Sequence, residues 1–169
     1  MKGWAWVAQG WAEDGREHIQ QGMQTVFATD SVLARPYFLA LLAEAHGKLG
    51  QPEAALSFMD EALALVEQTG EHHHLAEIHR LKGEILLSQS SDSPPEAEHC
   101  FHQGLDIARH QQAKSWELRA ATSLARLWQS QGKRQDAYDL LAPVYGWFTE
   151  GFDTADLQDA KILLEELQS

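Results

Sequence analysis

The sequence predicts an all-α fold: a helical-repeat solenoid of four helix pairs, each of about 40 residues, followed by a C-terminal capping helix. Small residues recur at a nearly constant spacing along the whole chain, and this is the strongest indication. The composition agrees, because 44% of the 169 residues are apolar and only five are prolines. Helix start and stop residues at the boundaries of each copy are the third indication.

The repeat is carried by small residues that occupy equivalent places in each copy. In the second helix of each pair they are spaced 40, 42 and 40 residues apart, at Gly15, Ala55, Ala97 and Ala137. A bulky apolar residue follows four positions later, at Ile19, Met59, Phe101 and Leu141. Seven positions later stand Gly22, Ala62, Gly104 and Val144. The first helices keep the same step, with Gly3, Ala43, Gly83 and Ala125. Antiparallel helices approach closely only where a side chain at the crossing is small, so the pattern predicts tightly packed pairs that stack to bury a common core.

The element boundaries follow from this pattern. The predicted repeats and capping helix cover residues 1–30, 35–69, 74–112, 115–150 and 154–167, within a single domain over 1–169. Pro36 and Pro52 open the two helices of the second repeat, where a missing N–H matters little. Gly70 and Gly132 are expected to stop helices.

The third and fourth repeats carry further signals. Ser93 to Glu96 is expected to cap the second helix of the third repeat, after a loop over 88–92 that holds two extra residues. Pro143 is expected to bend or interrupt the last helix of the fourth repeat. Apolar residues at helical spacing predict the capping helix, and they are Leu157, Ala160, Leu163, Leu164 and Leu167.

The pattern resembles the tetratricopeptide repeat (TPR), with Ala55, Ala62 and Ala97 at its small-residue positions, although its period exceeds the usual value of about 34. The segments 35–45, 80–84 and 147–157 resemble the C-terminal repeats of bacterial regulators. In those proteins such repeats follow a nucleotide-cyclase or DNA-binding domain and a regulatory ATPase, and the maltose-regulon activator is a distant relative. The resemblance implies a right-handed superhelix and a role in signalling.

The resemblance weakens at the N-terminus. Gly3 takes the place that Ala43 holds in the second repeat, so the first helix lacks about one turn. Two interpretations remain open: the sequence is a fragment of a longer protein, or it is a short gene product made of repeats alone.

The net charge and the single cysteine indicate which partners and which cellular compartment to expect. A formal net charge of −12 disfavours nucleic acid and anionic membrane surfaces as partners. Cys100 is the sole cysteine, so no disulfide forms within the chain, which suits a reducing compartment. The sequence shows no signal-peptide pattern and no long apolar run, and it therefore predicts a cytoplasmic protein.

Motifs for catalysis, nucleotides or cofactors are missing from the sequence, so we expect neither an enzyme nor a bound cofactor. His72, His73 and His74, with His79 nearby, form the one cluster that resembles a metal site; a solvated loop is the preferred interpretation, and no metal is predicted. His99 and His102 flank Cys100, which we interpret as a thiol that fills a helix contact.

Two surfaces are candidates for binding a partner. The first repeat has no predecessor to cover it, so its N-terminal edge is a candidate face for a homodimer through Trp4, Trp6 and Trp11. Four other aromatic residues are expected in the core, namely Phe38, Phe58, Phe101 and Phe148. The resemblance to TPR arrays implies a concave groove lined by exposed positions of the first helices: Tyr37, Glu44, Lys48, Glu77, Arg80, Glu84, Arg119, Arg126 and Gln129. A solvated helix face is the alternative for these positions.

The sequence therefore predicts a non-catalytic scaffold that binds a protein or peptide, as the regulatory repeat module of a bacterial signalling or transcription system. The alternative is a domain that senses a small-molecule effector on the concave face. A ligand that raises the melting temperature in a metabolite screen would favour the second function.

Overall fold

The computed structural model describes residues 2–27, 35–89 and 94–169. In these ranges the chain forms nine α-helices and no strand. The helices are α1 (Lys2–Ala8), α2 (Ala12–Phe27), α3 (Arg35–Lys48), α4 (Pro52–Thr69), α5 (Leu75–Gln89), α6 (Pro94–His110), α7 (Lys114–Ser130), α8 (Arg134–Tyr145) and α9 (Ala155–Gln168). Their order confirms the predicted all-α fold of four helix pairs followed by one more helix.

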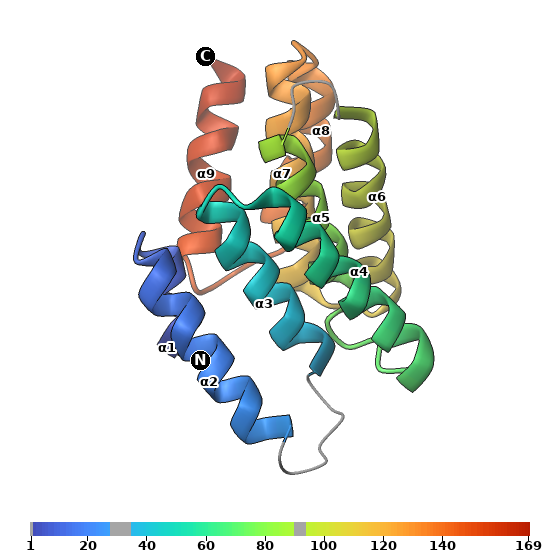
Figure 1. The fold of residues 1–169 in the computed structure, drawn as a ribbon. Helices are drawn as coiled ribbons and strands as arrows, with labels where there is room; N and C mark the ends of the chain where they lie inside the picture. Colours follow the sequence, from blue (N-terminus) through green and yellow to red (C-terminus); the bar gives the residue numbers. More distant parts are fainter. Residues whose placement is uncertain (1, 28–34, 90–93) are drawn as a thin grey trace.

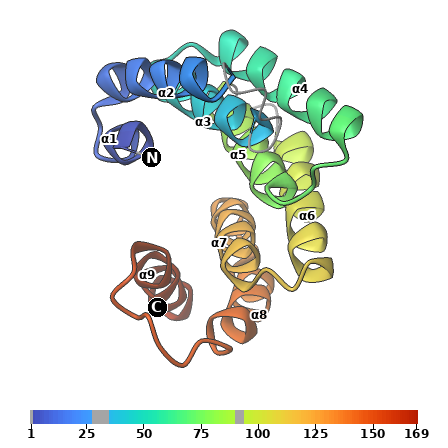
Figure 2. The same ribbon diagram turned by 90° about the horizontal axis from the view of Figure 1, so that it is seen from below.

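The helices form a curved array of two layers (Figures 1 and 2). The odd-numbered helices line the inner side of the arc and the even-numbered ones the outer side (Figure 2). The inner helices α1, α3, α5 and α7 each contact their own outer partner and also the next inner helix, the last of which is α9. The helix α9 therefore continues the inner layer, and α1 and α9 lie at the two ends of the arc.

The predicted small positions are where paired helices touch. All eight are buried. In the first pair, a Cβ added at Gly3 would meet the carbonyl oxygen of Gly15 at 2.7 Å, so the two predicted small residues face each other across the crossing. The bulky residues that follow, including Met59 and Phe101, are fully buried. The explanation by close helix approach is therefore confirmed at Gly3, Gly15 and Gly83, where an added Cβ would clash with the partner helix.

Gly22 departs from this pattern. A Cβ added there would have no heavy atom within 4 Å, whereas one at Gly104 would meet the carbonyl oxygen of Ala76 at 2.8 Å. Gly22 stands near the end of α2, beyond the short α1, so nothing approaches it. The expectation of close packing at every copy of this position is wrong for Gly22.

The core has two parts that meet at α5. One part joins α1 to α5 through residues such as Leu39 and Met59, and the other joins α5 to α9 around Phe101. Of the four aromatic residues expected in the core, Phe101 is fully buried. The remaining three are partly buried and pack against the core, namely Phe38, Phe58 and Phe148. The helix α9 buries Leu157, Ala160, Leu163 and Leu167 and contacts α7 and α8.

The helix ends follow the sequence signals. Gly70 adopts a left-handed conformation (φ 68°) and donates its N–H to the carbonyl of Val66, which ends α4. Pro143 lies inside α8, and the helix ends two residues later, at Tyr145. Ser93, the predicted cap of α6, lies outside the described residues. No helix in the described ranges is both long and apolar enough to cross a membrane.

Candidate interaction groove

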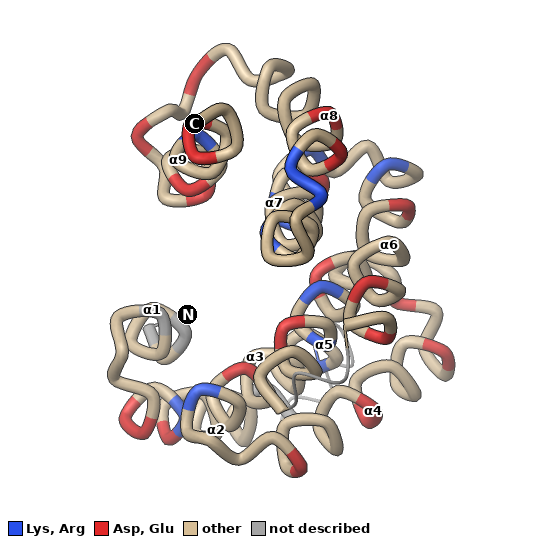
Figure 3. The backbone as a smooth tube through the Cα atoms, turned by 90° about the horizontal axis from the view of Figure 1, so that it is seen from above, with Lys and Arg blue, Asp and Glu red and all other residues tan. Residues whose placement is uncertain are grey.

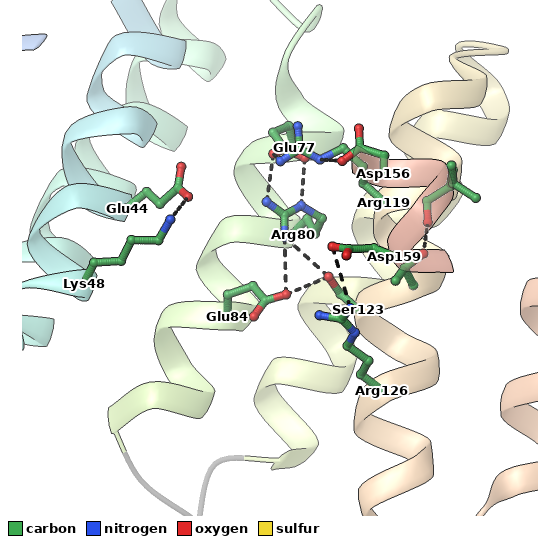
Figure 4. Close-up of polar contacts among 12 residues, drawn as sticks. Glu44, Lys48, Glu77, Arg80, Glu84, Arg119, Ser123, Arg126, Asp156 and Asp159 are labelled. Carbon is green, nitrogen blue, oxygen red and sulfur yellow. Dashed lines mark hydrogen bonds and ion pairs between the residues drawn. The ribbon is translucent and has the colours of Figure 1, made fainter. Parts of the chain in front are cut away.

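The inner side of the arc carries two adjoining hollows. The larger has a volume of about 580 Å³ and is lined from α3, α5, α7 and the start of α9. The smaller, of about 130 Å³, lies between α5, α7 and α9. We call the two together the inner groove. Most of its lining side chains are charged, so its chemistry is set by ion pairs (Figure 4).

A buried carboxylate lies at the base of the inner groove. Glu77, with 3% of its surface exposed, accepts hydrogen bonds of 2.8 Å from both Nε and Nη2 of Arg80, three residues on along α5. Arg119 of α7 reaches the same carboxylate, with its Nη2 2.8 Å from Oε1 of Glu77. Burial alone would lower the pKa of Arg80, but the hydrogen bonds from its guanidinium to Glu77 outweigh it and raise that pKa. Two guanidinium groups from neighbouring repeats thus share one carboxylate.

A second polar contact joins the same two helices. The hydroxyl of Ser123 on α7 donates a hydrogen bond of 2.7 Å to Glu84 on α5. Nη1 of Arg80 lies 3.3 Å from the same Glu84 oxygen. These contacts connect the third helix pair to the fourth across the groove floor.

The helix α9 contributes two carboxylates at the rim. Asp156 lies 3.9 Å from Nε of Arg119, and Asp159 lies 3.7 Å from Nη2 of Arg126. Both aspartates are at least half exposed, and ion pairs of this length and exposure contribute little to stability.

The nine groove residues predicted from the sequence fall into different environments. Seven of them lie at least partly open to solvent, and these are Tyr37, Glu44, Lys48, Glu84, Arg119, Arg126 and Gln129. The expectation of exposure is wrong for Glu77 and Arg80, because each neutralises the other beneath the surface. Six of the nine line the hollows: Glu44, Lys48, Arg80, Glu84, Arg119 and Arg126.

The other open residues lie along the same face. Lys48 binds Glu44 within α3 at 2.9 Å, and Gln129 donates a hydrogen bond of 3.2 Å to Glu166 of α9. Tyr37 stacks on His74, with ring centroids 4.2 Å apart, and burial together with the charge of Glu77 raises the pKa of its hydroxyl.

Among the lining residues that the sequence analysis missed, three take part in the polar contacts described above: Ser123, Asp156 and Asp159. The aspartates belong to α9, for which the sequence predicts the role of a capping helix. They stand three residues apart on one face of an amphipathic helix, and this spacing was the available signal.

The predicted N-terminal edge is exposed at one tryptophan. Trp11 is 63% exposed in the turn before α2, whereas Trp6 is partly buried and its ring lies 4.4 Å from that of His18. The side chain of Trp4 lies outside the described part of the chain.

The four histidines that resemble a metal site in the sequence lie in different environments in the structure. His72 and His73 are exposed, His74 stacks on Tyr37, and His79 lies within α5 rather than in the loop. Within residues 2–27, 35–89 and 94–169, no three His, Cys, Asp or Glu side chains are grouped to hold a metal ion. Cys100 is buried in the core, and this burial raises the pKa of its thiol.

Solved structures resemble this architecture over almost its whole length. Two crystal structures of the nearly identical TPR-like repeats of a kinesin-light-chain-type protein from Podosopora anserina align with a TM-score of 0.62 and cover 97% of this chain. The aligned parts are 88% and 89% of those chains, at sequence identities of 19% and 20%. The fold is TPR-like. At this level of identity, the likeness concerns the fold alone.

Part of a longer bacterial protein is similar to this chain in sequence. An uncharacterized protein of Rhizobium meliloti (strain 1021) is 27% identical over 134 residues, which cover 75% of this chain and 13% of that protein. The chain thus spans only a small part of this relative's length. No protein-family profile matches the chain.

Proposed function

We propose that the chain is a non-catalytic protein-interaction module that holds an extended peptide segment of a partner along its inner groove. One observation carries the proposal: the inner helices of a TPR-like array leave an open hollow of about 580 Å³, lined by side chains from four helices. Stacked helical repeats in general offer such extended concave surfaces to other proteins.

The chemistry of the hollow favours a peptide over a small molecule. Pockets for small ligands enclose most of the ligand, whereas this hollow is open, and seven of its twelve lining residues are charged. Hydrogen bonds and charge, spread over several helices, suit an extended chain. The effector-sensing alternative predicts instead that a metabolite raises the melting temperature, so a metabolite screen tests it directly.

We place this module in a bacterial regulatory system. The relative from Rhizobium meliloti supports this setting, because the matching segment is a minor part of a much longer protein. A single cysteine suits a reducing cytoplasm, and the net charge of −12 disfavours nucleic acid as the partner. Trp11 at the N-terminal edge is proposed as a contact between two copies of the chain.

Peptide selection tests the groove. Peptides would be selected from a random phage-displayed library against the full wild-type chain. Their affinities for the wild type and for the variant Ser88→Trp would then be measured by fluorescence anisotropy. Ser88 is exposed and lines the larger hollow, so a tryptophan there fills the site, and we expect binding to weaken about tenfold or more.

The matched control is Ser57→Trp, which places the same side chain at an exposed serine of the outer helix α4. It is expected to bind like the wild type. Equal loss in both variants would place binding elsewhere, and a library that yields no binding peptide would refute the proposed function.

A further inference from the structure

The cations of the inner groove are largely committed to partners. Arg80 and Arg119 have side chains only 10% and 18% exposed, and both pair with the buried carboxylate of Glu77. Lys48, although 43% exposed, lies 2.9 Å from Glu44. Arg126 is 55% exposed, and its partner is Asp159 at 3.7 Å. Among the described residues of the groove, an incoming anion would therefore find one weakly paired, exposed cation.

Three of the five carboxylates are open to solvent and weakly paired with arginine. Glu84, Asp156 and Asp159 are 47%, 50% and 60% exposed. Their guanidinium partners lie 3.3, 3.9 and 3.7 Å away. The pair of Asp159 with Arg126 is exposed on both sides, and such pairs contribute little to stability. Asp156 and Glu84 are exposed although their arginine partners are mostly buried, and Glu84 also accepts a hydrogen bond of 2.7 Å from Ser123. A cationic side chain of a ligand can therefore compete for the exposed oxygens of these carboxylates.

The helix α9 decides the sign of the groove's charge. Among the described residues that line the hollows, together with Glu77 beneath them, five carboxylates accompany four cations. Two of the five, Asp156 and Asp159, belong to α9. Without them three carboxylates would accompany four cations, and Arg126 would lose its ion-pair partner.

We infer, on the basis of the proposed function, that the inner groove selects a basic peptide segment and that α9 sets this preference through Asp156 and Asp159. The field of the whole molecule acts in the same direction, because a net charge of −12 attracts cationic segments from a distance. Acidic residues are spread over inner and outer helices (Figure 3), so this distant attraction is not confined to the groove. The short-range selectivity is assigned to α9.

Three labelled peptides of equal length test the inference. They share a Gly/Ser framework and differ only at four alternate positions, which carry Lys, Glu or Gln. The wild-type chain is expected to bind the Lys peptide at least about tenfold more tightly than the Glu peptide. In the double variant Asp156→Asn with Asp159→Asn, the preference for Lys should shrink about tenfold or reverse. Circular dichroism would check that the variant remains folded.

The outer helix α8 offers a matched control. Asp136 and Asp139 are also exposed aspartates three residues apart, and Asp136 stands in the first turn of α8 as Asp156 does in α9. Replacing both by Asn removes the same charge from the molecule and should leave the preference for Lys intact.

The outcomes separate the two claims. An equal loss in the α8 control would mean that net charge alone sets the preference, which overturns the inference and leaves the groove proposal standing. A wild-type chain that binds the three probes equally, or binds none while library peptides still bind, also overturns only the inference. Failure of every peptide, including those from the library, would overturn the proposed function itself.

Discussion

Glu77 and Arg119 join two neighbouring helix pairs through an ion pair of 2.8 Å whose carboxylate is 3% exposed. Arg80 holds the same carboxylate through two further hydrogen bonds from its own helix. The floor of the inner groove is therefore a structural element, and the side chains above it remain for a ligand. This separation of roles leads to the first prediction.

Glu77→Gln is expected to reduce the free energy of unfolding by about 3 kcal/mol. Glutamine keeps the shape of the side chain but leaves Arg80 and Arg119 facing each other without a carboxylate between them. Urea unfolding followed by circular dichroism measures the change. Glu165→Gln is the control, because its pair with Lys161 is 3.8 Å long and both side chains are more than 60% exposed. A loss as small as that of the control would contradict the structural role.

Gly83→Ala is expected to destabilise the fold by about 1–3 kcal/mol, although alanine is the better helix former. The added methyl group would lie 2.5 Å from Cε1 of Phe101, whose side chain is fully buried in the core.

Gly22→Ala provides the opposite case. Its Cβ meets nothing within 4 Å, so the gain in helix propensity should raise the free energy of unfolding by about 0.5–1 kcal/mol. Chemical denaturation of both variants measures whether the free energy of unfolding falls for Gly83→Ala and rises for Gly22→Ala. Stabilisation at Gly83 would show that the close approach to Phe101 is not tight.

The repeat pattern was sufficient to predict the packing of the helix pairs. Residues such as Gly15 and Ala97 hold equivalent places because the same backbone crossing recurs in each copy, and a recurring constraint leaves a recurring residue type. Gly22 shows the limit of this reasoning, because a glycine fits the pattern even where no neighbour approaches.

The sequence predicts six of the residues that line the groove, but not the burial of Glu77 and Arg80 or the contribution of α9. The spacing of Glu77 and Arg80 on one helix indicates that they can meet, yet their burial depends on Arg119, which lies 42 residues further along the chain. The contribution of Asp156 depends on the path of α9, which begins 41 residues after α7 and so continues the inner layer. Contacts between particular side chains of neighbouring inner helices leave no periodic trace in the sequence.

Self-association through the N-terminal edge predicts a dimer that dissociates on dilution. Trp11 is the most exposed of the large apolar side chains described, so Trp11→Ala should shift the chain to monomer at the same concentration. Light scattering behind size exclusion over a dilution series measures the molar mass. Trp147→Ala, at a tryptophan 57% exposed just after α8, should leave the dimer intact. A monomer at every concentration would exclude this contact.

His79 should make the fold sensitive to mild acid. Burial, with smaller effects of Lys82 and His99, lowers its pKa from 6.5 to about 4, so the folded chain holds it neutral where the unfolded chain is protonated. Below about pH 6.5 the unfolded state binds the extra proton, and stability is therefore lost as the pH falls toward 4. Because the side chain is partly exposed, we expect the contribution of His79 to the loss of stability between pH 7 and pH 5 to be about 1–2 kcal/mol.

Urea unfolding at both pH values should show a smaller difference in stability for His79→Leu than for the wild type. His72→Leu, at an exposed loop position, should keep the full difference, and equal pH dependence in all three proteins would contradict the burial of His79.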